Sequence, residues 1–288
     1  MIRDPEAIKP MLCKLTEKPF NSPDYIWEPK YDGERLTVLV KAPNTVVKMW
    51  ARSGREKAYM YPDLKFSVVK DCLLDGEVVS GSSFNGIQHR ANRQNGIAQA
   101  VKDYPATYEV FDIINLADTP IGGFPLIKRK EILQIICQET GNVKLAPYVQ
   151  DGVALFDAMK ANQLEGVVGK AKNSVYHEDK REWLKVKCWQ EAMFVAVGYT
   201  AGTGHRASQF GALVLADTKG NYVGSVGSGF TEETIGDIMK LFSPQSCLFP
   251  REPEKATWIK PFPVKVKFLE FSNDGMVRFP VFKGVVNG

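Results

Sequence analysis

Short runs of β-branched and aromatic residues dominate the first 190 positions of the chain, and Gly, Asn, Asp or Pro separate them. Runs bounded in this way are typical of β-strands. Their positions predict six strands, at residues 25–30, 35–41, 45–51, 72–80, 106–114 and 166–170. Because these runs follow one another in sequence-adjacent pairs, we expect the strands to pair mostly in antiparallel fashion.

Two segments between these runs carry apolar residues at helical spacing instead. One of them, PLIKRKEILQIICQET at residues 125–140, predicts a helix that stops at Gly141. The other lies near residues 153–163. Helices set apart from paired strands indicate an α+β fold with largely antiparallel sheets.

After about residue 189 the pattern changes to three strand-like runs, one helical segment and two further strand-like runs. These lie at residues 194–200, 211–217, 222–229, 231–242, 258–271 and 276–282. This order is typical of an OB-fold β-barrel, a common nucleic-acid-binding architecture, although other small barrels give similar patterns. We therefore expect two domains, residues 1–188 and residues 189–288.

Composition narrows the class of protein. The 288 residues are 44% hydrophobic, which is normal for a globular chain, and none of the apolar runs reaches the ~18 residues of a membrane span. The N-terminus lacks the apolar run of a signal peptide, so we expect a cytoplasmic protein without a membrane partner. Five scattered cysteines and three scattered histidines predict neither a disulfide framework, nor a zinc site, nor a His-centred triad.

The net charge of +4 is weak evidence for an anionic partner by itself. The distribution of the positive charge is more informative, because basic residues gather in residues 170–187 and 255–288. A solvated charged face is the alternative interpretation of both segments.

Lys30 stands between a proline and an aromatic residue, and Asp32 with Gly33 can turn the chain directly after it. Taken alone, this stretch also fits a hairpin with a solvated lysine. Further charged and aromatic residues follow in or beside apolar strand runs, where a charge is costly to bury unless it is paired or faces a site. These residues are Arg35, Arg52, Glu77, Phe111, Glu165, Lys170, Lys185 and Lys187.

This inventory suits nucleotidyl transfer from a nucleoside triphosphate. A lysine attacks phosphorus only when it is deprotonated, so desolvation or nearby cations must lower its pKa from about 10.4. Mg²⁺ needs one or two carboxylates, for which Glu77 and Glu165 are the candidates. Phe111 could stack on a purine and Glu28 could accept a hydrogen bond from its exocyclic amine. Each residue also has a structural alternative: Phe111 as core, Glu77 as a strand-end charge, and Lys185 with Lys187 as a solvent face.

The ordered set resembles the motifs of the covalent nucleotidyltransferase superfamily, and most closely a compact two-domain ATP-dependent DNA ligase of bacterial or bacteriophage type. In the ARSG motif, Ala51 precedes Arg52 where these enzymes often have a serine or threonine. The resemblance spans essentially the whole chain. Its motifs are KYDGER at 30–35, ARSG at 51–54, LDGEVV at 74–79, EVFD at 109–112, EGVVGK at 165–170, LKVK at 184–187 and VRFPVFKG at 277–284.

The resemblance implies a monomeric enzyme that uses ATP and Mg²⁺, with Mn²⁺ as a possible substitute, to seal nicked duplex DNA. It implies AMP transfer through Lys30, with Asp32, Lys185 and Lys187 as further catalytic residues. Arg278 and Lys283 would meet the pyrophosphate, and a hinge would lie near residues 187–190. The nucleotide-binding residues would be Glu28, Lys30, Arg35, Arg52, Glu77, Phe111, Lys170, Lys185, Lys187, Arg278 and Lys283.

Three other classes share part of this pattern. An NAD⁺-dependent ligase is disfavoured because the sequence has no zinc-binding cysteine set. An RNA ligase or a capping-type guanylyltransferase would share the lysine chemistry, and the RFPVFKG ending at residues 278–284 weighs against capping. A catalytically silent OB-type nucleic-acid-binding protein would have no need of the charged set around Lys30.

Overall fold

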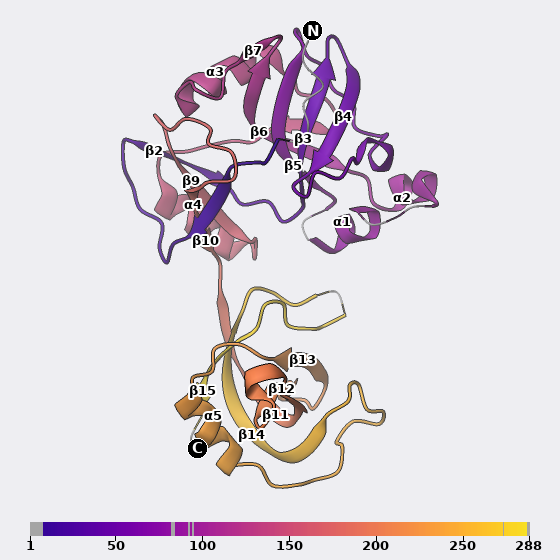
Figure 1. Cartoon of the computed structure of the whole chain (residues 1–288), viewed down its shortest axis with the longest axis vertical. Helices are drawn as coiled ribbons and strands as arrows, with labels where there is room; N and C mark the ends of the chain where they lie inside the picture. The colour runs from indigo at the N-terminus through magenta and orange to yellow at the C-terminus, as the bar shows by residue number, and fades with distance from the viewer. Residues whose placement is uncertain (1–7, 82–83, 92, 94, 273, 287–288) are drawn as a thin grey trace. The chain divides into compact units, whose positions relative to one another are not determined.

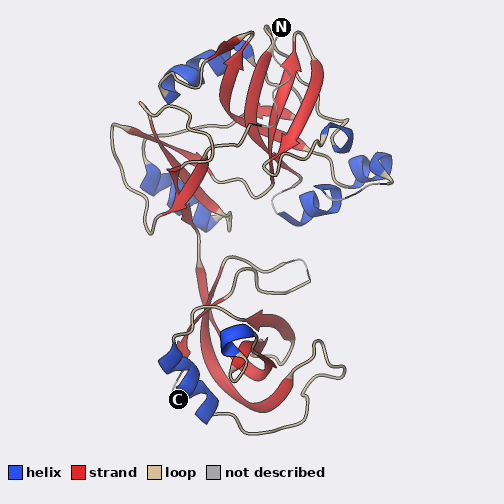
Figure 2. Cartoon of the chain, in the orientation of Figure 1, coloured by secondary structure: helices blue, strands red, loops and turns tan. Residues whose placement is uncertain are grey.

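The computed structural model describes residues 8–81, 84–91, 93, 95–272 and 274–286. The chain divides into two compact units, Met1–Cys188 and Trp189–Gly288 (Figure 1). Strands make up most of the regular structure, with few helices (Figure 2). The predicted α+β fold with largely antiparallel sheets is confirmed.

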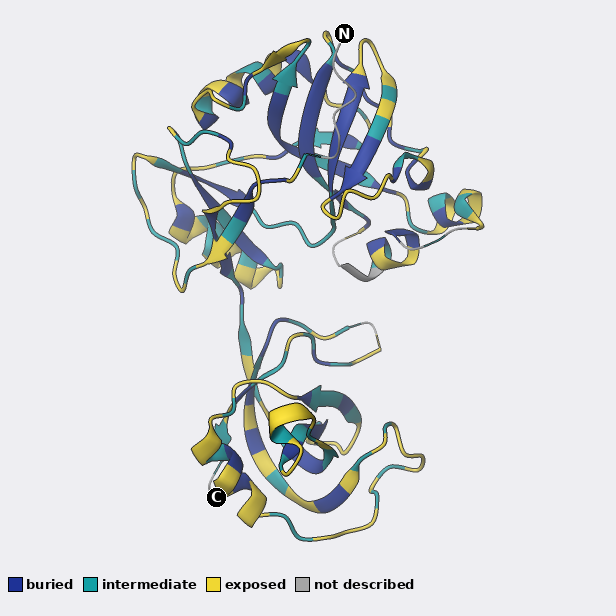
Figure 3. Ribbon diagram, in the orientation of Figure 1, coloured by how far each residue is buried: buried dark blue, intermediate teal, exposed yellow. Residues whose placement is uncertain are grey.

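The larger sheet of the first unit contains six strands. Its path runs β4 (Thr45–Ala51), β3 (Glu34–Lys41), β5 (Cys72–Val79), β6 (Thr107–Leu116) and β7 (Thr119–Pro120), and β8 (Val143–Leu145) pairs with β6 in parallel. Strands β3, β5 and β6 are buried over most of their length (Figure 3).

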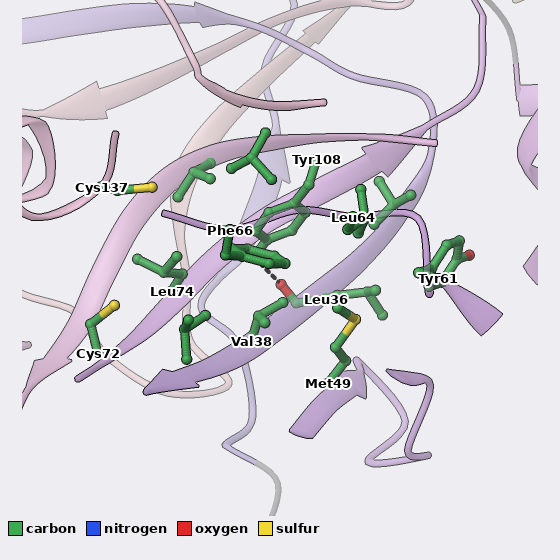
Figure 4. Close-up of a cluster of buried hydrophobic side chains, with 14 of the residues drawn as sticks. Leu36, Val38, Met49, Tyr61, Leu64, Phe66, Cys72, Leu74, Tyr108 and Cys137 are labelled. Atoms are coloured by element: carbon green, nitrogen blue, oxygen red, sulfur yellow. Dashed lines mark hydrogen bonds between the residues drawn. The ribbon is translucent and has the colours of Figure 1, made fainter. Parts of the chain in front are cut away.

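Apolar side chains of this sheet form the largest core of the unit (Figure 4). Leu36 and Val38 of β3 pack with Leu74 of β5 and with Tyr108 of β6. The buried hydroxyl of Tyr108 donates to the carbonyl of Leu36 at 2.9 Å, so the one polar atom of this ring has a partner.

A second, four-stranded sheet has the order β1 (Leu12–Leu15), β10 (Arg181–Lys187), β9 (Gly166–Ala171) and β2 (Tyr25–Pro29). Strand β1 is parallel to β10, and the other pairs are antiparallel. Trp27 of β2 packs with Val167, Val186 and side chains of α4 (Gly152–Ala161). Glycine is needed at position 169, because a Cβ there would lie 2.7 Å from the Trp27 ring.

Some elements differ from the sequence prediction. Helix α3 (Leu126–Ile136) ends well before Gly141, because Cys137 is extended and the chain pairs with the segment around Val68. The sequence pattern did not predict α1 (Phe84–Ala91), α2 (Ile97–Asp103) or the 3₁₀ turns η1 (Ala58–Met60) and η2 (Gly204–Arg206). It also missed β1, β7, β8 and β10, most of which are very short.

The second unit contains β11 (Gln190–Ala201), β12 (Phe210–Ala216), β13 (Tyr222–Val226), α5 (Glu232–Lys240), β14 (Thr257–Phe268) and β15 (Val281–Val285). The predicted order of three strands, a helix and two strands is confirmed. Thr231 and Thr234 form a capping box at the start of α5, and Ile235 and Ile238 face the core of the sheet.

The expected closed barrel is not formed. The sheet has the open order β13-β12-β11-β14-β15, and among the described residues no ladder joins β13 to β15. Single hydrogen bonds bridge the two edges instead, from Val277 N to the Val223 carbonyl and from Phe282 N to the Ser228 carbonyl. Strand β15 begins only at Val281, because Phe279 has a left-handed φ of 52° and Pro280 has no N–H to donate.

The described helices are all too short or too polar to cross a membrane.

Candidate functional site

One wall of a cavity of about 190 Å³ is a single face of the four-stranded sheet. Side chains alternate between the faces of a strand, so residues two apart point the same way. The register places Lys185 of β10 opposite Val168 of β9, and Val168 opposite Glu28 of β2. Just beyond β2, the Lys30 amide donates to the Gly166 carbonyl at 2.9 Å. The pairing of three strands therefore brings together motifs that are far apart in sequence.

The second wall comes from the six-stranded sheet. Arg35 of β3 lies opposite Glu77 of β5 in the register, and Phe111 of β6 and Arg52 after β4 complete this wall. The loop before β3 lies directly on β5, where a Cβ at Gly33 would come 2.0 Å from the carbonyl oxygen of Val78. Only glycine fits there, which explains the Asp-Gly turn after Lys30.

Lys30 forms an ion pair inside the site. Its Nζ donates to Oε2 of Glu165 at 2.6 Å, and Nζ of Lys187 lies 3.3 Å from the other oxygen of the same carboxylate. Burial lowers the pKa of Lys30, but the charges of Glu165 and Glu77 outweigh it and raise that pKa above the usual value. The lowered pKa that we expected for an attacking lysine is therefore not found in this state.

Glu77 lines the same cavity. Burial raises its pKa to about 7, although the charges of Lys30 and Arg35 oppose that shift. The charge of Glu165 raises the pKa of Glu77 further, so the two carboxylates act on one another. Two neighbouring carboxylates fit a Mg²⁺ ion, which takes oxygen ligands and keeps several waters. No cluster of three or more acidic, His or Cys side chains that could hold a metal occurs in the described part of the chain.

Lys170 lies deeper in the cavity wall. Its Nζ donates to Oε2 of Glu28 at 2.6 Å and lies 4.3 Å from the ring centroid of Phe111 and 4.0 Å from that of Trp183. Burial lowers the pKa of Lys170, and the charge of Glu28 opposes that effect. The rings of Phe111 and Trp183 meet edge to face at 5.9 Å, so two aromatic side chains surround this ammonium group.

Arg35 is held by a network of hydrogen bonds that no sequence pattern predicted. Its Nε and Nη2 donate to the carboxylate of Asp75 at 2.9 and 2.6 Å, and its Nη1 donates to the Met11 carbonyl at 2.6 Å. The Tyr176 hydroxyl also donates to Asp75, at 2.6 Å. Burial lowers the pKa of Arg35, but the charge of Asp75 opposes burial, and the net effect is a raised pKa.

Sequence signals for these missed residues differ. Asp75 is an acid inside an apolar run and two residues before Glu77, which places both on one face of β5. Tyr176 lies in the loop between β9 and β10, and no local pattern marks it. Trp183 stands two residues before Lys185 and shares its face of β10, so it could have been found from alternation.

The remaining predicted residues are placed as follows. Lys185 lines the cavity, and its pKa is lowered mainly by burial and also by the charge of Lys30. Asp32 lies partly exposed in the loop before β3, and Arg52 is exposed in the turn after β4. Arg278 and Lys283 belong to the second unit, where Arg278 pairs with Glu270 and Lys283 is exposed on β15.

Comparison with known families agrees with both units. Residues 10–187 match the profile described as ATP dependent DNA ligase domain, and residues 206–286 match the one described as ATP dependent DNA ligase C terminal region. The fold is that of a nucleotidyltransferase domain followed by an OB-fold domain. The chain belongs to the ATP-dependent DNA ligase family.

Among its relatives, the multifunctional non-homologous end joining protein LigD of Mycolicibacterium smegmatis is 28% identical over 306 residues, covering 98% of this chain and 38% of that protein. The SPbeta prophage-derived DNA ligase-like protein LigB of Bacillus subtilis is 33% identical over 197 residues, covering 67% of this chain and 72% of that protein. The chain thus spans well under half of the LigD proteins it matches.

Solved structures share the fold. A mycobacterial DNA ligase D complexed with ATP and MES superposes with a TM-score of 0.56 at 23% identity, covering 97% of this chain and 95% of that one. A Lig E DNA ligase superposes with a TM-score of 0.68 at 17% identity, covering 96% of this chain and 99% of that one.

Proposed function

We propose that this protein is an ATP-dependent DNA ligase that seals 5′-phosphate/3′-hydroxyl nicks in duplex DNA through an AMP adduct on Lys30. The observation that carries this proposal is the setting of Lys30. Its amine lines a cavity together with Lys185, Arg35 and Glu77, and it lies 2.6 Å from Glu165. Membership in the ATP-dependent DNA ligase family supplies the nucleotide and the reaction class.

The proposed reaction has three transfers. The Lys30 amine attacks the α-phosphorus of ATP, so a P–N bond forms and pyrophosphate leaves. An oxygen of the DNA 5′-phosphate then attacks the AMP phosphorus, the P–N bond breaks, and Lys30 is released. Finally the DNA 3′-hydroxyl attacks the activated 5′-phosphate and displaces AMP.

Lys30 must lose its proton before the first step, and in this structure Glu165 and Glu77 hold that proton on it. Mg²⁺ bound by Glu77 and Glu165, or Mn²⁺ in its place, would supply positive charge against these carboxylates and the α-phosphoryl oxygens. Lys185 and Lys187 lie on the same face of β10 and would stabilise the negative charge that develops on those oxygens.

The nucleotide would bind across both walls of the cavity. Phe111 would stack on the adenine, and Glu28 would accept a hydrogen bond from its 6-amino group. Lys170 would line the base end of the nucleotide site beside Glu28, while Arg35 and Arg52 would contact the ribose or the phosphate of the nick. In the first step, residues of the second unit would contact the pyrophosphate. The residues we propose for that contact are Arg278 and Lys283, and Asp32 is proposed to act beside Lys30.

We propose that the enzyme acts as a monomer in the cytoplasm, and that contacts to DNA phosphates dominate its affinity for nicked duplex.

A nick-sealing assay tests the function. The protein is incubated with Mg²⁺ and either ATP or GTP, and then with a duplex that carries one end-labelled nick in DNA or in RNA. We expect sealing of the DNA nick with ATP, and no sealing by Lys30→Ala. Sealing confined to RNA, or an adduct with GTP alone, would contradict the proposal.

A further inference from the structure

Glu28 is held by a second lysine that lies outside the cavity. Lys130 of α3 forms an ion pair with Oε1 of Glu28, while Lys170 of β9 donates to Oε2 at 2.6 Å. Glu28 and Lys170 line the cavity, and Lys130 contacts Glu28 from behind that wall. All three side chains are buried, with 2 to 3% of their surface exposed. Lys130 therefore can reach a bound nucleotide only through Glu28.

The two lysines fix the orientation of the Glu28 carboxylate and leave it able to accept hydrogen bonds. Oε1 pairs with Lys130 only through charge and accepts no hydrogen bond from the described part of the chain. A carboxylate has about four lone-pair positions, so Glu28 can still accept a hydrogen bond from a ligand in the cavity. Because one lysine holds each oxygen, the plane of the carboxylate cannot rotate without breaking a buried ion pair. Breaking a buried pair is strongly unfavourable, since it leaves an unpaired charge away from water.

Arg129, which precedes Lys130 on α3, holds a carboxylate of the other wall. Arg129 donates from Nε and Nη2 to the carboxylate of Asp112, both at 2.8 Å, and Asp112 directly follows Phe111 on β6. Two consecutive residues of one helix thus hold carboxylates on strands of two different sheets. The position of Glu28 relative to Phe111 is tied through α3.

We propose that Lys130 is a positioning residue for base selection, which holds Glu28 where it accepts a hydrogen bond from the 6-amino group of adenine. This inference rests on the proposed function, in which Phe111 and Glu28 bind the base. A base with a keto oxygen at position 6 would place that oxygen against the fixed carboxylate oxygens, and two acceptors repel one another. Lys130 thereby favours ATP over a 6-keto nucleotide.

Helix α3 offers a matched control. Lys128 is two residues before Lys130, but its side chain is 61% exposed and pairs with Glu131 on the surface of the same helix. Lys128→Met removes the same charge from the same helix without touching the cavity wall.

The test measures dissociation constants by calorimetry for ATP and for inosine triphosphate, which carries the 6-keto oxygen. Protein is first freed of AMP with pyrophosphate and Mg²⁺, and both are then removed. Binding is measured without divalent metal, so that no AMP transfer competes with it. We expect Lys130→Met to reduce the preference for ATP about tenfold, which is the effect of losing about one hydrogen bond. Lys130→Arg should restore most of the preference, and Lys128→Met should leave it unchanged.

Two further measurements separate positioning from a purely structural role. In a Glu28→Gln background, Lys130→Met should change the ATP preference little, because both changes act through one carboxylate. A wild-type preference in folded Lys130→Met, even with lowered thermal stability, would overturn the inference. If Lys130→Met does not fold, Lys130→Gln is measured against the same criterion. Failure of the wild-type chain to form an adduct with ATP and Mg²⁺ would contradict the proposed function, whereas the binding ratio tests Lys130 alone.

Discussion

The Nζ of Lys30 lies 2.6 Å from Oε2 of Glu165, and this pair raises the pKa of the lysine that we expect to attack ATP. The two residues are 135 positions apart in sequence and meet because β2 and β9 pair in antiparallel fashion. In this state the pair favours the protonated form of Lys30, so the proposed role of Lys30 as the nucleophile requires added positive charge that lowers this pKa.

Replacing Glu165 should lower the pKa of Lys30. In Glu165→Gln, burial would still lower this pKa and only Glu77 would remain as a strong opposing charge. Competitive acylation of Lys30 as a function of pH measures the pKa without any turnover. Lys128, which is exposed on α3 and pairs with Glu131, is the internal reference. A Lys30 pKa that stays the same or rises in Glu165→Gln would show that the pair does not set it.

Glu77 should make the folded chain less stable at neutral pH than at mildly acidic pH. Its pKa is raised from the usual 4.5 to about 7, so the folded chain binds more protons than the unfolded chain between these values. The free energy of unfolding should therefore fall as pH rises through that window, by up to about 3 kcal/mol. Denaturant unfolding of Glu77→Gln should lack this decrease. A steeper pH dependence in the variant than in the wild type would contradict the assignment.

Replacing Asp75 should lower the free energy of unfolding strongly. Removing its charge leaves the Arg35 guanidinium, which is 15% exposed, without its main partner, and breaking a buried pair of this kind costs up to about 3 to 5 kcal/mol. Asp75→Asn tests this by denaturant unfolding. The comparison variant is Asp237→Asn, whose exposed pair with Lys240 should contribute less than about 1 kcal/mol. Similar losses in the two variants would refute the role of the buried network.

Binding to nicked duplex should weaken steeply with salt. If basic residues in 170–187 and 255–288 contact the DNA phosphates, counterion release should reduce affinity about a hundredfold or more between 50 and 200 mM salt. Fluorescence anisotropy with a labelled nick measures this in the absence of ATP. Affinity that does not change with salt over this range would contradict the prediction that phosphate contacts dominate DNA binding.

Much of the site could be predicted from the sequence, because alternation along strands depends on local pattern. Lys30, Glu77, Phe111, Lys170 and Lys185 all line one cavity, as their joint order had indicated. Strand alternation also explains why residues two apart, such as Lys185 and Lys187, lie on the same side of β10.

The parts that were missed depend on long-range pairing. Tyr176 reaches Asp75 only because the loop between β9 and β10 lies against β5, and no short pattern encodes that contact. Lys130 lay inside a correctly predicted helix, but its burial against Glu28 depends on how α3 packs across two sheets. The early end of α3 likewise follows from tertiary pairing, in which the Gln138 amide donates to the Ser67 carbonyl.

The most direct test of the account is to locate the adduct. The protein is incubated with Mg²⁺ and α-labelled ATP, digested, and its peptides are examined by mass spectrometry. We predict one AMP group, bound through an acid-labile P–N bond to Lys30, and no adduct in Lys30→Arg. AMP on another residue, or an adduct that persists in Lys30→Arg, would contradict the account.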